Sequence, residues 1–193
     1  MKQANSGETG LSCLTGFTGF AVSPFVLLRE ITSDTMAHRI TWTSGLKPGM
    51  KAPEFQAILD DGSTLSSRSL KGKPLVLFFY NHDGTETCTV EACNLRDHYQ
   101  LLLKKGFQVI GVSEDSARKH QGFKKKYKLP YPLISDPENA LAKLFDVFGE
   151  KHFMGRVSDT VHRTTFVIDA DWKIQAVIHP VVSADHAAQI LAL

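Results

Sequence analysis

The most constraining feature of the sequence is an unbroken apolar run from Pro74 to Tyr80, PLVLFFY. A strand with water on one face alternates apolar and polar residues, whereas a continuously apolar run suits a strand buried on both faces. The segment from Phe107 to Val112, FQVIGV, has the same character and follows a helical stretch. Buried strands separated by helices indicate βαβ units and therefore a central sheet covered on both sides.

The other expected elements complete an α/β fold with a mixed sheet flanked by helices. A short hairpin with Asp61-Gly62 as its turn opens the fold, and two strands joined by a short turn close it as an antiparallel pair. The expected strands are Phe55–Leu59, Ser63–Leu65, Pro74–Tyr80, Phe107–Val112, Tyr131–Ile134, Thr164–Asp169 and Ile174–Ile178. The expected helices are Thr89–Lys105, Ser116–Lys128, Pro137–Val147 and a last helix capped by Ser183 and ending at Leu193.

Composition limits the classes of partner. The 193 residues carry a formal net charge of +2, which is too balanced to indicate nucleic acid or an anionic membrane as a partner. The lysine run at residues 124–126 fits a solvated helix face. We expect one domain over residues 43–193, with residues 1–42 as an extension that is disordered or absent from the mature protein.

The extension contains an uncharged stretch from Gly10 to Leu28, which is diluted by polar residues. It fits neither a secretory signal nor a membrane span. A translation start at Met36 is a second interpretation. Cys13 lies in this segment and is assigned no role. We therefore expect a cytoplasmic protein, with a targeting signal in the extension as a second, less supported interpretation.

Only three cysteines occur, and Cys88 and Cys93 are close together. Few cysteines suit a reducing compartment and a redox or metal role. Cys88 falls in or near the first turn of a helix that follows the buried strand. Unpaired backbone N–H groups in that turn favour negative charge, so a thiol there has a lowered pKa and a larger share of the nucleophilic thiolate.

The neighbours of Cys88 fit this interpretation. Thr85, three residues earlier, can place a hydroxyl at the mouth of the turn. Glu91, one turn later, would raise the thiol pKa unless a cation faced it. Arg163, which precedes a predicted strand, is the candidate for the cation that faces Glu91. A guanidinium held by a carboxylate can stabilise a thiolate and the charge that develops when a peroxide O–O bond breaks.

In a regular helix, Cα atoms five residues apart are separated by about 8–9 Å. A disulfide needs Cα atoms within about 7 Å, so Cys88 and Cys93 could bridge only if that turn unwound. Spacing alone also allows two inert buried thiols. Zinc is disfavoured, because C-x4-C is wider than the usual ligand spacing and no second Cys/His pair follows. His82 fits a surface loop better than a catalytic base.

The segment Thr85-x-x-Cys88-Thr-x-Glu91-Ala-Cys93-Asn-x-Arg96-Asp97 closely resembles the Q-type peroxiredoxins, also called bacterioferritin comigratory proteins. The resemblance extends over about Leu46 to Leu193. It includes Gly111-Val-Ser-x-Asp115, Leu133-Ile-Ser-Asp-Pro137 and Arg163-Thr-Thr-Phe-Val-Ile-Asp169.

The resemblance implies a thioredoxin fold and reduction of hydrogen peroxide and organic hydroperoxides without metal or organic cofactor. It implies that Cys88 is oxidised to a sulfenic acid and that Cys93 resolves it as an intramolecular disulfide. Thioredoxin or a similar dithiol then reduces the disulfide. Thr85 and Arg163 match the family's active-site threonine and arginine. We expect a monomer or weak dimer.

The chain departs from the family at Asn81, where the family pattern has proline, and at Glu86-Thr87, where Pro-Gly is common. Asparagine introduces a polar amide and frees the backbone φ. Glu86 adds negative charge near the thiol, which tends to raise its pKa. The alternative hypothesis is therefore a thiol redox sensor or disulfide-exchange module of thioredoxin fold without efficient peroxidase activity.

Overall fold

The computed structural model describes residues 44–153 and 155–193. The predicted extension at residues 1–42, with Cys13 and Met36, lies outside the described residues. The strands of the main sheet are β1 (Gln56–Leu59), β2 (Thr64–Ser66), β3 (Leu75–Phe79), β4 (Gln108–Ser113), β5 (Leu133–Ser135), β8 (Thr164–Ile168) and β9 (Ile174–Ile178).

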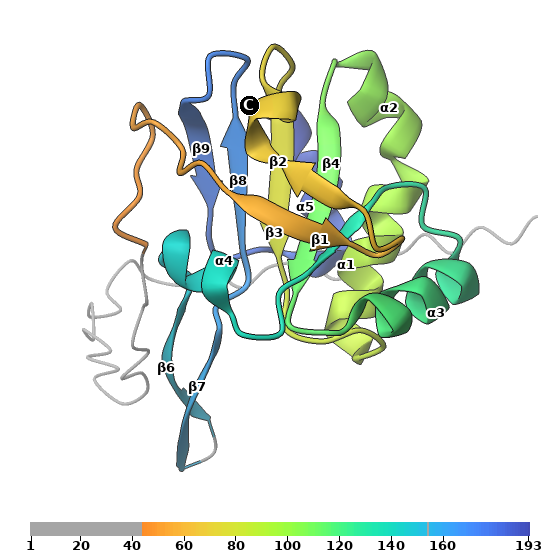
Figure 1. Ribbon diagram of the computed structural model, residues 1–193, viewed down its shortest axis with the longest axis vertical. Helices are drawn as coiled ribbons and strands as arrows, with labels where there is room; N and C mark the ends of the chain where they lie inside the picture. The colour runs from red at the N-terminus through yellow and green to blue at the C-terminus, as the bar shows by residue number, and fades with distance from the viewer. Residues whose placement is uncertain (1–43, 154) are drawn as a thin grey trace, which may run out of the picture. The chain divides into compact units, whose positions relative to one another are not determined.

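These seven strands form one mixed sheet in the order β2-β1-β5-β4-β3-β8-β9 (Figure 1). The three strands β3, β4 and β5 run parallel, while β1, β8 and β9 pair antiparallel with their neighbours. The opening hairpin and the closing antiparallel pair both lie where the sequence predicts them. The mixed α/β sheet expected from the two apolar runs is confirmed.

The unbroken apolar run of β3 serves two cores. Val76 and Phe78 pack into one buried cluster, and Leu75, Leu77 and Phe79 pack into another on the opposite face. Successive side chains of a strand point to opposite faces, so a strand covered on both sides needs apolar residues at every position. This arrangement is the physical reason for the run.

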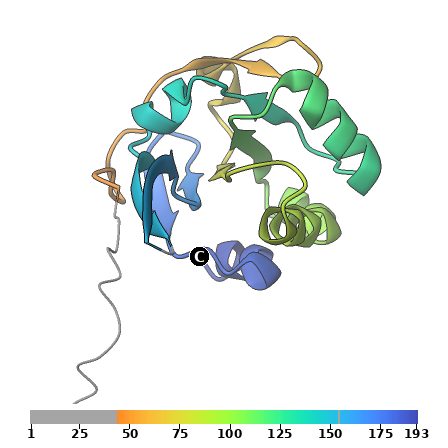
Figure 2. The ribbon, with the colours of Figure 1, turned by 90° about the horizontal axis from the view of Figure 1, so that it is seen from below.

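Different helices cover the two faces, as the end-on view in Figure 2 shows. The helices α1 (Glu86–Asp97), α2 (Tyr99–Lys104), α3 (Ala117–Tyr127) and α5 (His186–Leu191) contribute side chains to the first cluster. The short helices η1 (Ser67–Leu70) and α4 (Ala140–Leu144) contribute to the second. Among the described residues, no helix combines the length and apolar character needed to cross a bilayer.

The expected helix Thr89–Lys105 is wrong at its start and in its continuity. The helix begins at Glu86 and is interrupted at His98, whose backbone leaves the helical region. The His98 ring nitrogen Nδ1 lies 2.9 Å from the carbonyl oxygen of Asn94. A side chain that bonds a terminal carbonyl favours a helix end at that position.

The expected start of a helix at Pro137 is also wrong, since α4 begins at Ala140. The Asp136 carboxylate accepts hydrogen bonds from the backbone N–H groups of Leu141 and Ala142, at 3.1 and 2.9 Å. Asn139 adopts a left-handed backbone conformation with φ of 55°. Residues 137–139 therefore form a turn, and a side chain before that turn satisfies the helix N-terminus.

Ser183 does not cap the last helix. It lies in the 3-10 turn η2 (Ser183–Asp185), and α5 follows from His186. The backbone N–H of Ala187 instead donates to the side-chain oxygen of Asn94, at 2.8 Å. A residue of α1 therefore caps α5 across the interface between the two helices.

The sequence interpretation missed the 3-10 helix η1 and a hairpin of β6 (Phe148–Phe153) and β7 (Arg156–Val161). The hairpin forms a separate two-stranded sheet that extends past the end of the main sheet in Figure 1. Its strands carry many polar and charged residues, GEKH and RVSDT. Because the hairpin does not enter the main sheet, it lacks the apolar pattern by which buried strands are recognised.

Candidate active site

Cys88 is buried at the end of the sheet, in the first turn of α1. A six-residue loop leads from the end of β3 to this helix, so the side chain points back into the cluster between sheet and helices. Only 1% of the residue is exposed. The guanidinium Nη2 of Arg163 donates to its sulfur at 3.2 Å. The structure thus brings together two residues that lie 75 positions apart.

The pKa of the Cys88 thiol reflects opposing effects. Burial raises this pKa, but hydrogen bonds from Thr85 and the backbone at His82, together with the charge of Arg163, lower it by more. The net pKa lies below the ordinary value of a cysteine, despite the nearby Glu86. A lowered pKa increases the thiolate fraction at neutral pH, and the thiolate is the nucleophile.

Arg163 is held by Glu91, as the sequence predicts. The guanidinium Nε lies 2.8 Å from a carboxylate oxygen of Glu91, which is fully buried on α1. Burial raises the pKa of Glu91 to about 8, and Arg163 opposes that effect. One guanidinium therefore contacts both a buried carboxylate and the reactive sulfur, which fixes its orientation toward Cys88.

His186 reaches the same carboxylate from α5 and was not predicted. Its ring nitrogen Nδ1 lies 3.3 Å from the second oxygen of Glu91, and Nε2 lies 2.8 Å from the hydroxyl of Thr165. Burial and the charge of Arg163 lower the pKa of His186 to about 3, so the ring is neutral. The only sequence signal is its spacing to Ala187 and Ile190 on the core-facing side of α5.

Thr85 stands directly before α1 with extended backbone, but its side chain makes no capping bond to the helix. Its hydroxyl donates to the carbonyl of His82 at 3.2 Å and also belongs to the groups that lower the pKa of Cys88. Thr85 is exposed at the mouth of the turn, where a peroxide can approach it. Its proposed role in binding peroxide stays a prediction.

Beneath the loop lies a second polar cluster that the sequence interpretation missed. The Asp83 carboxylate accepts from the Tyr80 hydroxyl at 2.7 Å and lies 2.7 Å from Nδ1 of His120. The other ring nitrogen of His120 lies 3.1 Å from the carbonyl oxygen of Ile134. Since a carbonyl only accepts, that nitrogen carries a hydrogen. The cluster ties the loop to α3 and β5.

His82 behaves as the surface residue that the sequence indicates. It is exposed and lies 3.4 Å from a carboxylate oxygen of Glu114. The histidine that is buried against this loop is instead His120, which lies on α3. A histidine aligned with Phe123 on the apolar face of α3 is the signal that could have identified it.

Cys93 lies on the same helix as Cys88, and both thiols are free. Five residues correspond to about 500° of helical rotation, so the two side chains leave α1 on different faces. Cys88 is buried, whereas Cys93 is half-buried. The structure therefore holds the pair apart within a continuous helix, and joining them requires that the helix open.

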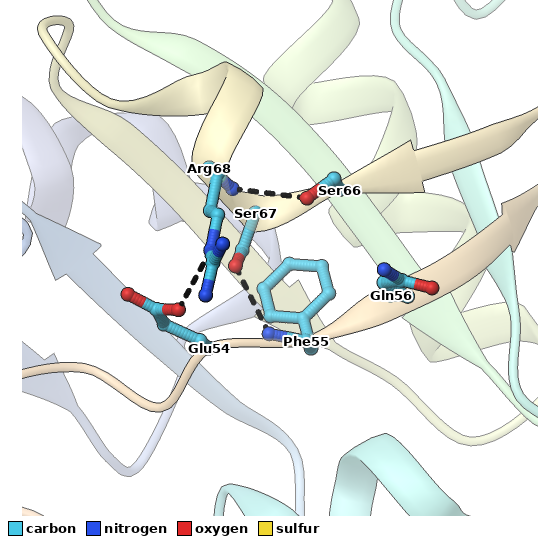
Figure 3. A pocket seen from close by; sticks show the side chains of 6 residues that line it. All are labelled: Glu54, Phe55, Gln56, Ser66, Ser67 and Arg68. Carbon is cyan, nitrogen blue, oxygen red and sulfur yellow. Dashed lines mark hydrogen bonds and ion pairs between the residues drawn. The ribbon is translucent and has the colours of Figure 1, made fainter.

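Two further features of the described residues concern metal-ligand clusters and surface cavities. Residues 44–153 and 155–193 contain no group of three histidine, cysteine or acidic side chains placed to hold a metal ion. A surface cavity of about 400 Å³ lies beside β1 and β2 (Figure 3). Its Glu54 carboxylate is paired with Arg68 and Lys71, and none of the predicted site residues lines it.

Comparison with known proteins identifies the family of the chain. The AhpC/TSA family model matches residues 48–177. The chain is 38% identical over 146 residues to peroxiredoxin Bcp of Escherichia coli, covering 76% of this chain and 94% of that protein. It is 39% identical over 143 residues to peroxiredoxin Bcp of Bacillus subtilis, covering 74% and 91%.

The chain is a Q-type peroxiredoxin of the AhpC/TSA family.

Solved structures agree. Peroxiredoxin Q of Xanthomonas campestris has a TM-score of 0.70 at 30% identity, covering 75% of this chain and 94% of that one. A structure of the Xanthomonas campestris bacterioferritin comigratory protein, studied for alkyl peroxide reduction, has a TM-score of 0.70 and covers 75% and 95%. The mixed sheet of this peroxiredoxin is therefore a thioredoxin fold, and the protein is a thiol peroxidase.

Proposed function

We propose that this peroxiredoxin reduces hydrogen peroxide and organic hydroperoxides with electrons from thioredoxin or a similar dithiol protein. The contact between Arg163 Nη2 and Cys88 Sγ, 3.2 Å long at the start of a helix, carries the proposal. It places a fixed positive charge where a thiolate attacks and where charge develops on the peroxide. The alkyl peroxide reduction described for the Xanthomonas campestris relative supports the substrate class.

In the first step, the Cys88 thiolate attacks the terminal oxygen of the hydroperoxide. An S–O bond forms, the O–O bond breaks, and the departing alkoxide or hydroxide takes a proton to leave as alcohol or water. Cys88 becomes a sulfenic acid. Thr85 and Arg163 hold the peroxide and stabilise the departing oxygen: Arg163 already donates to the sulfur, and the Thr85 hydroxyl can rotate from the His82 carbonyl to donate to the peroxide.

In the second step, the Cys93 sulfur attacks the sulfur of the sulfenic acid, a disulfide forms and water leaves. The first turn of α1 must unwind for this step, because an intact helix separates the two cysteines. The partner dithiol then reduces the disulfide and restores both thiols, becoming a disulfide itself. Since both cysteines belong to one chain, a monomer or weak dimer completes the cycle, in a reducing compartment such as the cytoplasm.

The test is peroxide consumption by the full chain with and without thioredoxin, its reductase and NADPH. Wild type should turn over only with the complete reducing system. Cys88→Ser should consume no peroxide, and Cys93→Ser should complete one turnover and then stop with a sulfenic acid. Mass spectrometry of the oxidised wild type should show a Cys88–Cys93 link, and a link to Cys13 would refute that pairing.

The alternative, a redox sensor, predicts a different rate. Oxidation of Cys88 by hydrogen peroxide would then proceed about as slowly as that of free cysteine. Stopped-flow measurement on the reduced chain separates the two, and a slow rate would overturn the peroxidase proposal for this chain.

A further inference from the structure

Asn81 connects the cysteine loop to the hairpin that leads to Arg163. It follows Tyr80, the buried residue directly after β3, and is half-buried. Its side-chain nitrogen Nδ2 donates to the hydroxyl of Thr160 at 2.8 Å and to the carbonyl oxygen of Val161 at 2.9 Å. A primary amide has two hydrogens on this nitrogen, so both donors are used.

These acceptors lie at the end of β7, immediately before the residues that turn into β8. Arg163 is two residues beyond Val161, and its guanidinium contacts Glu91 and Cys88. The connection from Thr160 to Arg163 is thus fixed at two points to the segment that carries the reactive cysteine. At the start of this connection, the Asn81 amide donates to Thr160 and Val161. At its end, the charged guanidinium of Arg163 contacts Glu91 and Cys88.

We propose that Asn81 is a positioning residue that keeps Arg163 against Cys88 by hydrogen-bonding the end of β7 to the cysteine loop. It does not touch the reacting sulfur in this arrangement, and it acts through the backbone that leads to the arginine. This role deepens the peroxidase function, because it concerns how the same site is assembled.

The position of Asn81 outside α1 adds a second consequence. The turn that must open for Cys93 to reach Cys88 begins at Glu86, whereas Asn81 lies five residues earlier. The bonds to Thr160 and Val161 can therefore persist while the contact between Arg163 and Cys88 is broken. They retain the loop near β7, so that the arginine contact re-forms when the disulfide is reduced and the helix closes.

The experiment compares Asn81→Ala, Thr160→Val and the double variant on the full chain. Ser158→Ala is the matched control, because Ser158 is exposed two residues earlier on β7 and makes no hydrogen bond to the loop. The first readout is the thiol pKa of Cys88, measured from the pH dependence of alkylation by iodoacetamide in a Cys93→Ser background. The second is the rate constant of Cys88 oxidation by hydrogen peroxide.

Asn81→Ala should raise the pKa of the Cys88 thiol and slow oxidation by about tenfold, as expected for a misplaced catalytic group. Thr160→Val should have a smaller effect in the same direction, because the bond to the Val161 carbonyl remains. The double variant should be no worse than Asn81→Ala alone, since both changes remove the same contact. Ser158→Ala should match wild type.

Two results would overturn the proposal. One is an unchanged thiol pKa and oxidation rate in a folded Asn81→Ala protein, whatever its stability. The other is strict additivity of the two substitutions, which would show that Asn81 and Thr160 act separately. Should Asn81→Ala not fold, an unchanged thiol pKa in Thr160→Val decides against the role. Alkylation involves no peroxide, so a failure of the peroxidase function would leave this comparison readable.

Discussion

The two halves of α1 are held in different ways. The half after Glu91 receives hydrogen bonds to its backbone or side chains from three other parts of the fold. The bonds join Tyr131 to the carbonyl of Ala92, Asn94 to both Ala184 and Ala187, and Arg96 to the carbonyl of Tyr127. Among the described residues, the backbone from Glu86 to Glu91 makes no hydrogen bond to another element.

The half up to Glu91 is instead held by the contacts of two buried side chains. Cys88 is buried in the core cluster and contacts Arg163, and Glu91 contacts Arg163 and His186. The contact between Cys88 and Arg163 is lost when the sulfur of Cys88 moves away, whereas the hydrogen bonds of Ala92, Asn94 and Arg96 involve no reacting group. In the proposed cycle, we therefore expect the turn containing Cys88 to open while the turn after Cys93 remains docked.

The largest loss of stability is expected from a substitution of Glu91, which lies where the two halves of α1 meet. Glu91→Leu should destabilise the fold by about 3–5 kcal/mol, because it leaves the partly buried guanidinium of Arg163 without its carboxylate. Glu91→Gln is the control, since it keeps a polar side chain of the same size beside the guanidinium, and it should lose less. Urea denaturation at neutral pH measures both, and equal losses would contradict the importance of the pair.

A smaller effect is expected from loosening the docked half. Asn94→Ala removes one bond to the Ala184 carbonyl and one from the Ala187 N–H, and should cost about 1–3 kcal/mol. Hydrogen exchange should be slower over residues 92–97 than over residues 87–91 in the reduced wild type. In Asn94→Ala, the difference in exchange rate between these two segments should become smaller. Equal exchange of both halves in the wild type would refute the comparison itself.

The smallest effect is expected from a substitution of Thr85, which lies directly before the first turn of α1 and affects the pKa of the Cys88 thiol. Thr85→Val removes a hydroxyl that lowers the pKa of the Cys88 thiol, so this pKa should rise, while stability changes little. The thiolate exists above the thiol pKa, so the rise of alkylation rate with pH should move to higher pH. Thr85→Ser retains the hydroxyl and should keep the wild-type profile. A shift in Thr85→Ser as large as in Thr85→Val would assign the effect to packing.

The sequence predicted the parts of the site that depend on local order. Cys88 follows a recognisable buried strand and begins a helix, and Glu91 lies one turn later on the same helix. Arg163 precedes β8, which pairs with β3 along its full length, and so the arginine reaches the end of β3 where the cysteine loop begins. A cation opposite Glu91 was expected because an unpaired carboxylate there would raise the pKa of the Cys88 thiol.

The residues it missed depend on how distant elements pack. Whether His120 and His186 face water or the core follows from the placement of α3 and α5, and neither has a motif around it. Asp83 resembles an ordinary loop residue until His120 is placed against it. The helix boundaries failed for a related reason, because Asp136 and Asn94 cap helices through contacts that are not evident from propensity.

The burial of Cys88 links the redox state of the proposed cycle to the stability of the fold. Its sulfur fills part of the same packed cluster as Phe78 and Ala92. Drawing it out to meet Cys93 leaves a space that the neighbouring side chains fill only in part, at a cost in free energy. That cost favours the dithiol form, so a substitution that improves packing around Cys88 should make the disulfide easier to reduce. Conversely, one that enlarges the space should prolong the life of the oxidised protein.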